Sequence, residues 1–351
     1  METITIVGGG IAGLALAACL DKSRFEVTVI EKRPELPAVG TVLAMWPNAQ
    51  RALEKVGVLD EARAASPLIG SGSIRNAAGE PWITVNGGQM FGISRVDLLR
   101  LLDSAVPASV RRTTATVQSV PDVPGLVVGA DGVHSAVRRE AWGAGTDGRL
   151  TPYLAVRGII PSRVEPQDVG EYWGRGNLFG VANAAGGTNW YASYRSDLGP
   201  SGIDAAAVLE QTRGYFAGHA PVIRRVLTAA TPELSLVQRI WTTPPLRSFV
   251  CGRIVLIGDA AHAMTPNLGR GACEALVDAA TLAELLNTLP HEEALRAYNR
   301  RRRPRTLGLS VASSVMARVA LADDAQPFRD RLLALVRPAK ARSAVVTSSR
   351  R

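Results

Sequence analysis

The sequence predicts an α/β protein in which a parallel, helix-covered sheet is interrupted by an inserted antiparallel sheet. At the start, a β-branched run at 3–8, a helix pattern of small residues at 11–21 and a second β-rich run at 26–31 follow one another without proline. This order is typical of a right-handed strand–helix–strand crossover. Four strand-like stretches follow later, at 153–160, 170–174, 178–182 and 188–195. The last two flank Ala184–Gly187, which indicates an antiparallel hairpin.

The bulk composition indicates a folded, soluble protein. A length of 351 residues suggests about two domains, and 46% hydrophobic and 20% charged residues are ordinary globular values. No apolar run approaches the ~20 residues that a membrane span needs, so no transmembrane helix is expected. A strand-like run begins within two residues of Met1 and leaves no room for a signal peptide, so the cytoplasm is the expected location.

Neither a metal site nor a nucleic-acid site is expected. The three cysteines are scattered and the four histidines have no metal-binding spacing. The net charge is +9, and its densest basic run is 300–305. We expect these arginines to form the solvated C-terminal end of a helix that begins at His291. The buried side of that helix is expected to carry Ala294, Leu295, Ala297 and Tyr298.

A glycine motif at the first predicted turn indicates a dinucleotide site. Gly8, Gly10 and Gly13 form GxGxxG directly after a strand and at the start of a helix. The glycines permit a tight turn, a close approach of a pyrophosphate and close helix–strand packing, with the phosphates at the helix N-terminus. Glu31 ends the second strand, where it can accept hydrogen bonds from a ribose and repel a 2′-phosphate. The motif therefore favours FAD or NAD over NADP at this site.

Two further glycine-containing segments follow predicted strands. The segment 129–138 follows the strand 126–128 and turns into a helix. The segment 253–271 contains a strand that ends at Gly258 and Asp259, and a second helix begins close to Gly271. A carboxylate at such a strand end can bind a polyol hydroxyl, and the glycines let the next helix present free amides to a ligand.

With these three fingerprints in order, the chain resembles the group A flavoprotein aromatic hydroxylases. This family includes p-hydroxybenzoate hydroxylase, salicylate hydroxylase and the tetracycline-inactivating monooxygenases. The resemblance extends to residues 46–53, 94–98, 156–158 and 298–304 and covers the chain to about residue 335. It implies a Rossmann-like FAD-binding domain, an inserted antiparallel substrate domain and C-terminal helices.

The resemblance also implies the residues that hold the cofactor. Arg95 matches the helix arginine that reaches the ribityl and phosphate portion, and Asp131 and Gly132 match the second fingerprint. Asp259 matches the carboxylate on the ribityl chain. The full expected set is Gly8, Gly10, Ala12, Gly13, Glu31, Lys32, Arg33, Arg95, Asp131, Gly132, Gly258, Asp259, Pro266, Gly269, Gly271 and Ala272.

The implied reaction is hydroxylation of an aromatic or polyketide-like small molecule. In the family, NADPH or NADH reduces the flavin, O2 adds to give a flavin hydroperoxide, and its distal oxygen passes to the substrate. The protein mainly orients the substrate and excludes water, so no catalytic side chain is assigned. Candidates for the substrate pocket are Arg157, Trp173, Phe179 and Tyr191. The alternative explanation for Arg157 is an ion pair at the domain boundary. Packing within the sheet explains the three aromatic residues about as well.

The expected FAD-binding domain comprises 1–69, 96–150 and 246–290, and the expected substrate domain comprises 70–95 and 151–245. C-terminal helices are expected at 291–340 and a flexible tail at 341–351. Three features depart from the family or attract attention. Arg270 stands where many relatives have glutamine, His262 is more often structural than catalytic, and the connection 118–125 is short.

Several alternatives stay open at this point. The short connection 118–125 leaves room for a catalytically impaired FAD-binding homologue. A second alternative is an FAD oxidoreductase that does not insert oxygen. The sequence does not decide the identity of the substrate, the choice between NADH and NADPH, or the oligomeric state.

Overall fold

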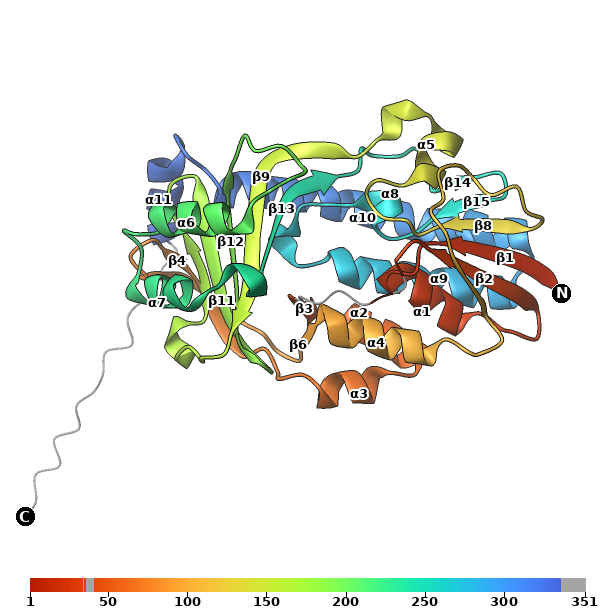
Figure 1. Cartoon of the computed structure of the whole chain (residues 1–351), viewed down its shortest axis with the longest axis horizontal. Coiled ribbons are helices and arrows are strands. Elements are labelled where there is room, and N and C mark those ends of the chain that lie inside the picture. The colour runs from red at the N-terminus through yellow and green to blue at the C-terminus, as the bar shows by residue number, and fades with distance from the viewer. Residues whose placement is uncertain (34, 36–40, 336–351) are drawn as a thin grey trace, which may run out of the picture.

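The computed structural model describes residues 1–33, 35 and 41–335. It places two sheets at opposite ends of an elongated molecule, and the long helix α10 extends from one end to the other (Figure 1). The expected tail at 341–351 lies outside the described residues. None of the helices in the described ranges is long and apolar enough to cross a membrane.

One end is a six-stranded sheet that is parallel except for its edge strand β14. Its strands are rich in valine and isoleucine because helices cover both faces, and Ile4, Ile6 and Val128 are fully buried. The final strand before the connection to β8 lies at 111–114. In spatial order the strands are β14 (Val250–Cys251), β15 (Ile254–Leu256), β8 (Leu126–Gly129), β1 (Glu2–Val7), β2 (Phe25–Glu31) and β7 (Arg111–Thr114).

The short connection 118–125 does not disturb this sheet. Gly125 has φ +80°, and the Thr3 hydroxyl donates to the Pro124 carbonyl at 2.8 Å. Arg253 donates to the carbonyls of Val123 and Gly125. Strand β8 therefore pairs in parallel with both β1 and β15 in continuous register, and the crossover geometry is intact.

The other end is a seven-stranded sheet that is antiparallel except between β10 and β4. The predicted hairpin is confirmed, since Ala184 pairs with Gly187. Two helices, α6 (Ala205–Tyr215) and α7 (Pro221–Ala229), cover the outer face. In spatial order the strands are β13 (Ser235–Thr242), β9 (Arg149–Ile160), β12 (Gly187–Arg195), β11 (Asn177–Ala184), β10 (Gly170–Trp173), β4 (Ser71–Asn76) and β5 (Pro81–Asn86).

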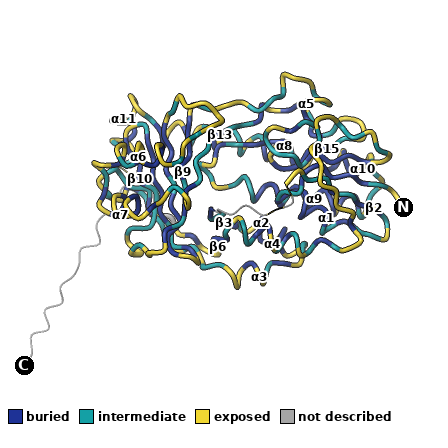
Figure 2. Tube along the Cα trace, viewed as in Figure 1, coloured by how far each residue is buried: buried dark blue, intermediate teal, exposed yellow. Residues whose placement is uncertain are grey.

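Helices and a small ribbon fill the space around the two sheets. In Figure 2 the strands are mostly dark blue, whereas the outer helices carry exposed stripes. Ser94 caps the helix that begins at Arg95, because its hydroxyl accepts a hydrogen bond from the Asp97 amide at 3.0 Å. The elements are the ribbon β3 (Val42–Met45) and β6 (Phe91–Ser94), and the helices α1 (Ile11–Cys19), α2 (Pro47–Val56), α3 (Leu59–Ala64), α4 (Arg95–Ala105), α5 (Ala136–Trp142), α8 (Asp259–His262) and α9 (Gly271–Thr288), with short 3-10 helices at Ala144–Thr146, Pro166–Asp168, Pro232–Leu234 and Pro266–Leu268.

The C-terminal helices correct one expectation. Helix α10 (His291–Ala320) continues through Pro304 instead of ending at the arginine run, and α11 (Gln326–Leu335) follows it. Pro304 removes one intrahelical hydrogen bond, and buried residues of the helix before and after Pro304 pack well enough to outweigh that loss. Arg302, expected in solvent, is 3% exposed because it faces buried carboxylates on α9, whereas Arg301 is exposed.

Candidate functional site

Three loops meet at the edge of the six-stranded sheet where β1, β8 and β15 end. A Cβ atom built on Gly8 would lie 2.3 Å from the Ala130 carbonyl oxygen, and one built on Gly13 would lie 1.9 Å from the Gly8 carbonyl oxygen. Nothing lies within 4 Å of the same position on Gly10. The first two glycines therefore permit close packing, whereas Gly10 leaves free space at the N-terminus of α1, as expected for a phosphate site.

The acidic residue at the end of β2 lies over this glycine turn. One carboxylate oxygen of Glu31 accepts from the Gly9 amide at 2.6 Å, and the other accepts from the Arg33 amide at 2.8 Å. Each oxygen keeps a free acceptor position. Lys32 and Arg33 are exposed beside it.

The second segment is fixed by a carboxylate and a buried arginine. One oxygen of Asp131 accepts from the amides of Ala136 at 2.8 Å and Val137 at 3.3 Å, while the other is buried without a partner in the described residues. Arg138 is fully buried and donates to backbone carbonyls, among them Ala260 at 2.8 Å. Arg138 therefore ties the second segment to the third.

The third segment contains the turn from β15 into α8. Gly258 has φ +60° and ψ −142°, and a Cβ atom there would lie 3.1 Å from the Ala12 Cβ. Asp259 is exposed, and its carboxylate has no hydrogen-bonding partner in residues 1–33, 35 and 41–335. Its Oδ1 atom lies 4.0 Å from the position of a Cβ on Gly271, at the start of α9. The structure thus brings an unpaired carboxylate and a helix N-terminus together, with Gly269 in the loop between them at φ +60°.

Arg270 points inward from this loop. Its guanidinium lies 4.9 Å from the centre of the Trp46 ring and 2.8 Å from Glu274. Its side chain is 12% exposed and therefore does not extend into solvent.

Sequence reasoning missed a buried ionic cluster behind the third segment. Glu274 and Asp278 on α9 contact Arg302 of α10 at 2.6 Å each. His262 donates to Asp278 at 2.6 Å, which fits its predicted structural role. Burial opposes protonation of His262, but Asp278 outweighs burial and raises its pKa. The only signal in the sequence was two acids, four residues apart, on an otherwise apolar helix face.

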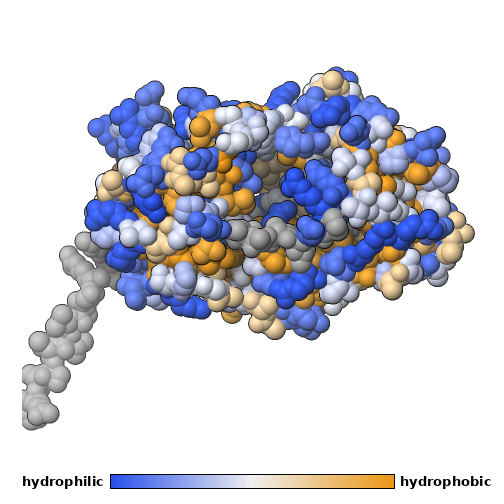
Figure 3. Space-filling view, viewed as in Figure 1, coloured by the Kyte–Doolittle hydropathy of each residue, from blue (hydrophilic) through white to orange (hydrophobic). Residues whose placement is uncertain are grey.

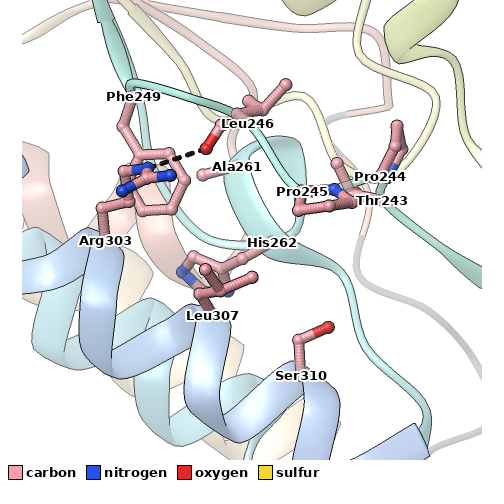
Figure 4. Close-up of a pocket in the computed structure, with 10 residues that line it drawn as sticks. All are labelled: Thr243, Pro244, Pro245, Leu246, Phe249, Ala261, His262, Arg303, Leu307 and Ser310. Atoms are coloured by element: carbon pink, nitrogen blue, oxygen red, sulfur yellow. Dashed lines mark hydrogen bonds between the residues drawn. The ribbon is translucent and has the colours of Figure 1, made fainter.

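A small pocket lies beside His262, between α8 and α10 (Figure 4). Arg303 donates to the Leu246 carbonyl at 2.7 Å across one side of it. The Nδ1 atom of His262 is buried without a partner in the described part of the chain. The lining residues are Thr243, Pro244, Pro245, Leu246, Phe249, Ala261, His262, Arg303, Leu307 and Ser310.

Strand alternation separates the four expected pocket residues. Tyr191 of β12 lies directly opposite Arg157 of β9 on one side and Gly180 of β11 on the other. Leu178, two residues before Gly180 and therefore on the same face, lies opposite Trp173 of β10. Arg157, Trp173 and Tyr191 thus share one face of the seven-stranded sheet. Phe179 lies on the opposite face, stacked on Trp190 at 5.7 Å in the core under α6 and α7. The structure therefore does not bring Phe179 together with the other three.

On the shared inner face, Arg157 has no carboxylate partner among the described residues. Arg157 donates to Gln238 at 2.8 Å, and its Nε atom is buried without a partner in the described residues. Burial, and secondarily the nearby Arg95, lower the pKa of Arg157 to about 10. The guanidinium donates to an amide oxygen, and no carboxylate in the described ranges forms an ion pair with it, so the alternative explanation by a boundary ion pair does not hold among these residues.

The aromatic residues of this face are held by one acid. Tyr191 donates to Glu171 at 2.6 Å, and Trp173 donates to the other oxygen of Glu171 at 2.9 Å. A Cβ atom on Gly180 would lie 2.1 Å from the Tyr191 ring, so this glycine lets the ring lie flat on the sheet. Trp173 packs edge-on against Trp82 at 6.5 Å. Figure 3 shows the molecular surface hollowed between the two sheets.

Comparisons with known proteins agree with the geometry. Residues 6–38 match an NAD(P)-binding Rossmann-like domain, and residues 238–310 match an FAD binding domain. Aurachin C monooxygenase/isomerase of Stigmatella aurantiaca is 33% identical over 81% of this chain and 80% of its own length. The chain belongs to the FAD-dependent monooxygenases. It is therefore an oxidoreductase with FAD as its cofactor, and NAD(P)H is the co-substrate typical of these hydroxylases.

Other members of this monooxygenase family support the same conclusion. The 3-amino-4-hydroxybenzoate 2-monooxygenase of Streptomyces cremeus is 33% identical over 86% of this chain and 84% of its own length. The solved structure of Klebsiella pneumoniae HpxO with FAD and uric acid has a TM-score of 0.83, at 23% identity, and covers 95% of this chain and 92% of its own. The predicted family and fold class are thus confirmed.

Proposed function

We propose that this monooxygenase hydroxylates an aromatic small molecule with O2 and NAD(P)H, and that FAD lies across the edge of the six-stranded sheet. One observation carries the proposal. The free space at Gly10, the unpartnered buried oxygen of Asp131 and the unpaired carboxylate of Asp259 all lie on the three loops that meet at that edge. Each is a feature that a bound dinucleotide would satisfy.

The cofactor-binding roles follow from charge and position. The N-terminus of α1 would hold the pyrophosphate, and Glu31 would accept from the adenosine ribose. Asp259 would accept from the ribityl chain, with Arg95 close to the same portion. The N-terminus of α9, beginning at Gly271, would stabilise negative charge on the ring system. Lys32, Arg33, Gly132, Pro266, Gly269 and Ala272 complete the proposed contacts, with Ala12 and Gly13 packing behind them.

The bound flavin would accept hydride from NAD(P)H and activate O2 for transfer to the substrate. The chain's own contribution is to orient the substrate and to exclude water between the two sheets. Arg157 would donate to a polar or anionic substituent on the aromatic ring. Tyr191, fixed by Glu171, would form a flat wall, and Trp173 would support it from the side.

Relatives supply the substrate chemistry that fits this face. The name of one relative contains an amino-hydroxybenzoate, and one structural neighbour was solved with uric acid. Both molecules are planar and carry acidic or hydroxyl groups. A planar aromatic substrate with such a group is therefore the proposed class for this chain.

A panel of aromatic acids, phenols and polycyclic phenols tests the proposal. We expect substrate-stimulated NAD(P)H oxidation and one atom of labelled O2 in the product. Stoichiometric hydrogen peroxide, with product that never carries the label across the panel, would instead indicate a flavin oxidoreductase that does not insert oxygen. No stimulation by any member, in protein that retains FAD, would indicate an impaired homologue.

A further inference from the structure

The C-terminal helix α10 contacts the helix behind the proposed flavin loops through a buried ionic cluster. The side chain of Arg302 in α10 is 4% exposed, and the side chains of both acids that it contacts on α9 are 0% exposed. Its Nη2 atom lies 2.6 Å from Glu274, and its Nε atom lies 2.6 Å from Asp278. One guanidinium therefore fixes two acids on successive turns of the helix that begins at the proposed ring site.

Asp278 transmits this contact to the turn that carries Asp259. Its second oxygen accepts from the Gly258 amide at 2.9 Å and from His262 Nε2 at 2.6 Å. These two residues lie immediately before and three residues after Asp259. Gly258 has φ +60°, a conformation that glycine adopts freely, and the hydrogen bond from its amide to Asp278 helps to fix this turn. One carboxylate thus clamps both ends of the short helix that presents Asp259.

Glu274, the second acid that Arg302 contacts, holds residues on the other side of the proposed site. Its Oε1 atom accepts from Arg270 at 2.8 Å and from Asn48 at 3.1 Å, while Oε2 binds Arg302. Arg270 in turn lies over Trp46. The loop before α9 and the start of α2 are therefore fixed by the acid that Arg302 neutralises.

Such a cluster is a poor source of stability, because desolvation of buried ions offsets much of their attraction. Its contribution is to hold the surrounding residues in a defined geometry. Among the groups held in this way are the unpaired carboxylate of Asp259 and the free N-terminus of α9. We infer that Arg302 and Asp278 are positioning residues for FAD, through which the C-terminal helix α10 sets the affinity of the flavin site. This inference rests on the proposed placement of the ribityl chain at Asp259.

The test measures the Kd of FAD for apoprotein variants by quenching of flavin fluorescence. We expect Arg302→Met and Asp278→Asn to weaken binding about tenfold or more, and Arg302→Lys to recover part of the loss, because a charged hydrogen bond is removed and partly restored. Arg301→Met is the matched control, since Arg301 is adjacent, its side chain is 53% exposed, and its guanidinium lies 3.7 Å from the surface acid Glu284. Each titration is run at a temperature at which circular dichroism shows that apoprotein variant to be folded, and Arg302→Lys carries the test if Arg302→Met does not fold.

A double-mutant cycle with Asp259→Ala separates positioning from general destabilisation. If Arg302 acts through Asp259, its replacement should weaken FAD binding by less than roughly threefold once Asp259 is already alanine. Equal effects in both backgrounds, or a lower apoprotein Tm with unchanged Kd, would overturn the inference. An unchanged Kd in Asp259→Ala alone would instead refute the proposed placement of the flavin.

Discussion

Replacement of Gly10 by alanine separates cofactor binding from folding more cleanly than any other change in the first loop. Gly10 is the N-cap of α1 with φ −82° and ψ −169°, which alanine also adopts. Nothing lies within 4 Å of the Cβ position. We therefore expect the free energy of unfolding of the apoprotein to fall by at most about 1 kcal/mol, the usual cost of alanine at an N-cap.

The FAD affinity should respond much more strongly. The new methyl group would occupy the space through which the pyrophosphate approaches the amides of α1. Loss of one charge-assisted hydrogen bond corresponds to about 1.5–3 kcal/mol, which is roughly a tenfold to hundredfold increase in Kd. The assay is titration of apoprotein with FAD, paired with thermal unfolding of the same apoprotein.

Two other glycines calibrate this experiment. Gly214→Ala in α6 is the matched control, because its Cβ position is also empty and lies far from the site in the sequence. Gly13→Ala should instead destabilise the apoprotein, since its Cβ would lie 1.9 Å from the Gly8 carbonyl oxygen. Wild-type FAD affinity in Gly10→Ala would refute the reasoning that the pyrophosphate lies at α1.

Asp259→Ala should weaken FAD binding roughly tenfold to hundredfold without unfolding the chain, and extraction should release FAD and not FMN. Arg157→Gln should raise the Kd of a carboxylated aromatic substrate about tenfold or more but leave that of its neutral amide analogue unchanged; equal loss for both would argue against charge recognition. Acid unfolding reports on Asp278. Burial raises its pKa, but His262 and Arg302 outweigh burial and lower it to about 2. Stability from this group is therefore present above its usual pKa near 4 and is lost as pH falls toward 2, so Asp278→Asn should flatten the decline of Tm between those values.

The sequence predicted the elements whose signals are local. The strand–helix–strand unit and the hairpin at Ala184–Gly187 each depend on neighbouring residues, and the structure contains both. The glycine spacing at Gly8 and Gly13 similarly reports a steric need that any backbone with this turn must meet.

The incorrect predictions concern features that depend on contacts between segments far apart in the sequence. Helix α10 was predicted to end near Pro304, because a run of arginines reads as a solvated end, but Arg302 faces acids that lie 24 and 28 residues away in the sequence. Phe179 was grouped with Tyr191 because both are aromatic, whereas the register of β11 against β12 sends them to opposite faces.

The sequence by itself therefore determined the family, the cofactor and the three loops proposed to hold it, because close backbone approach to a dinucleotide demands glycines and acids at fixed spacings. The tertiary structure decided which side chains share a face and which charges share a site. It left Arg157 on the inner face with no acidic partner in the described part of the chain, and it buried Arg302 between two acids. Those arrangements depend on strand register and helix packing between segments far apart in the chain, which no local pattern encodes.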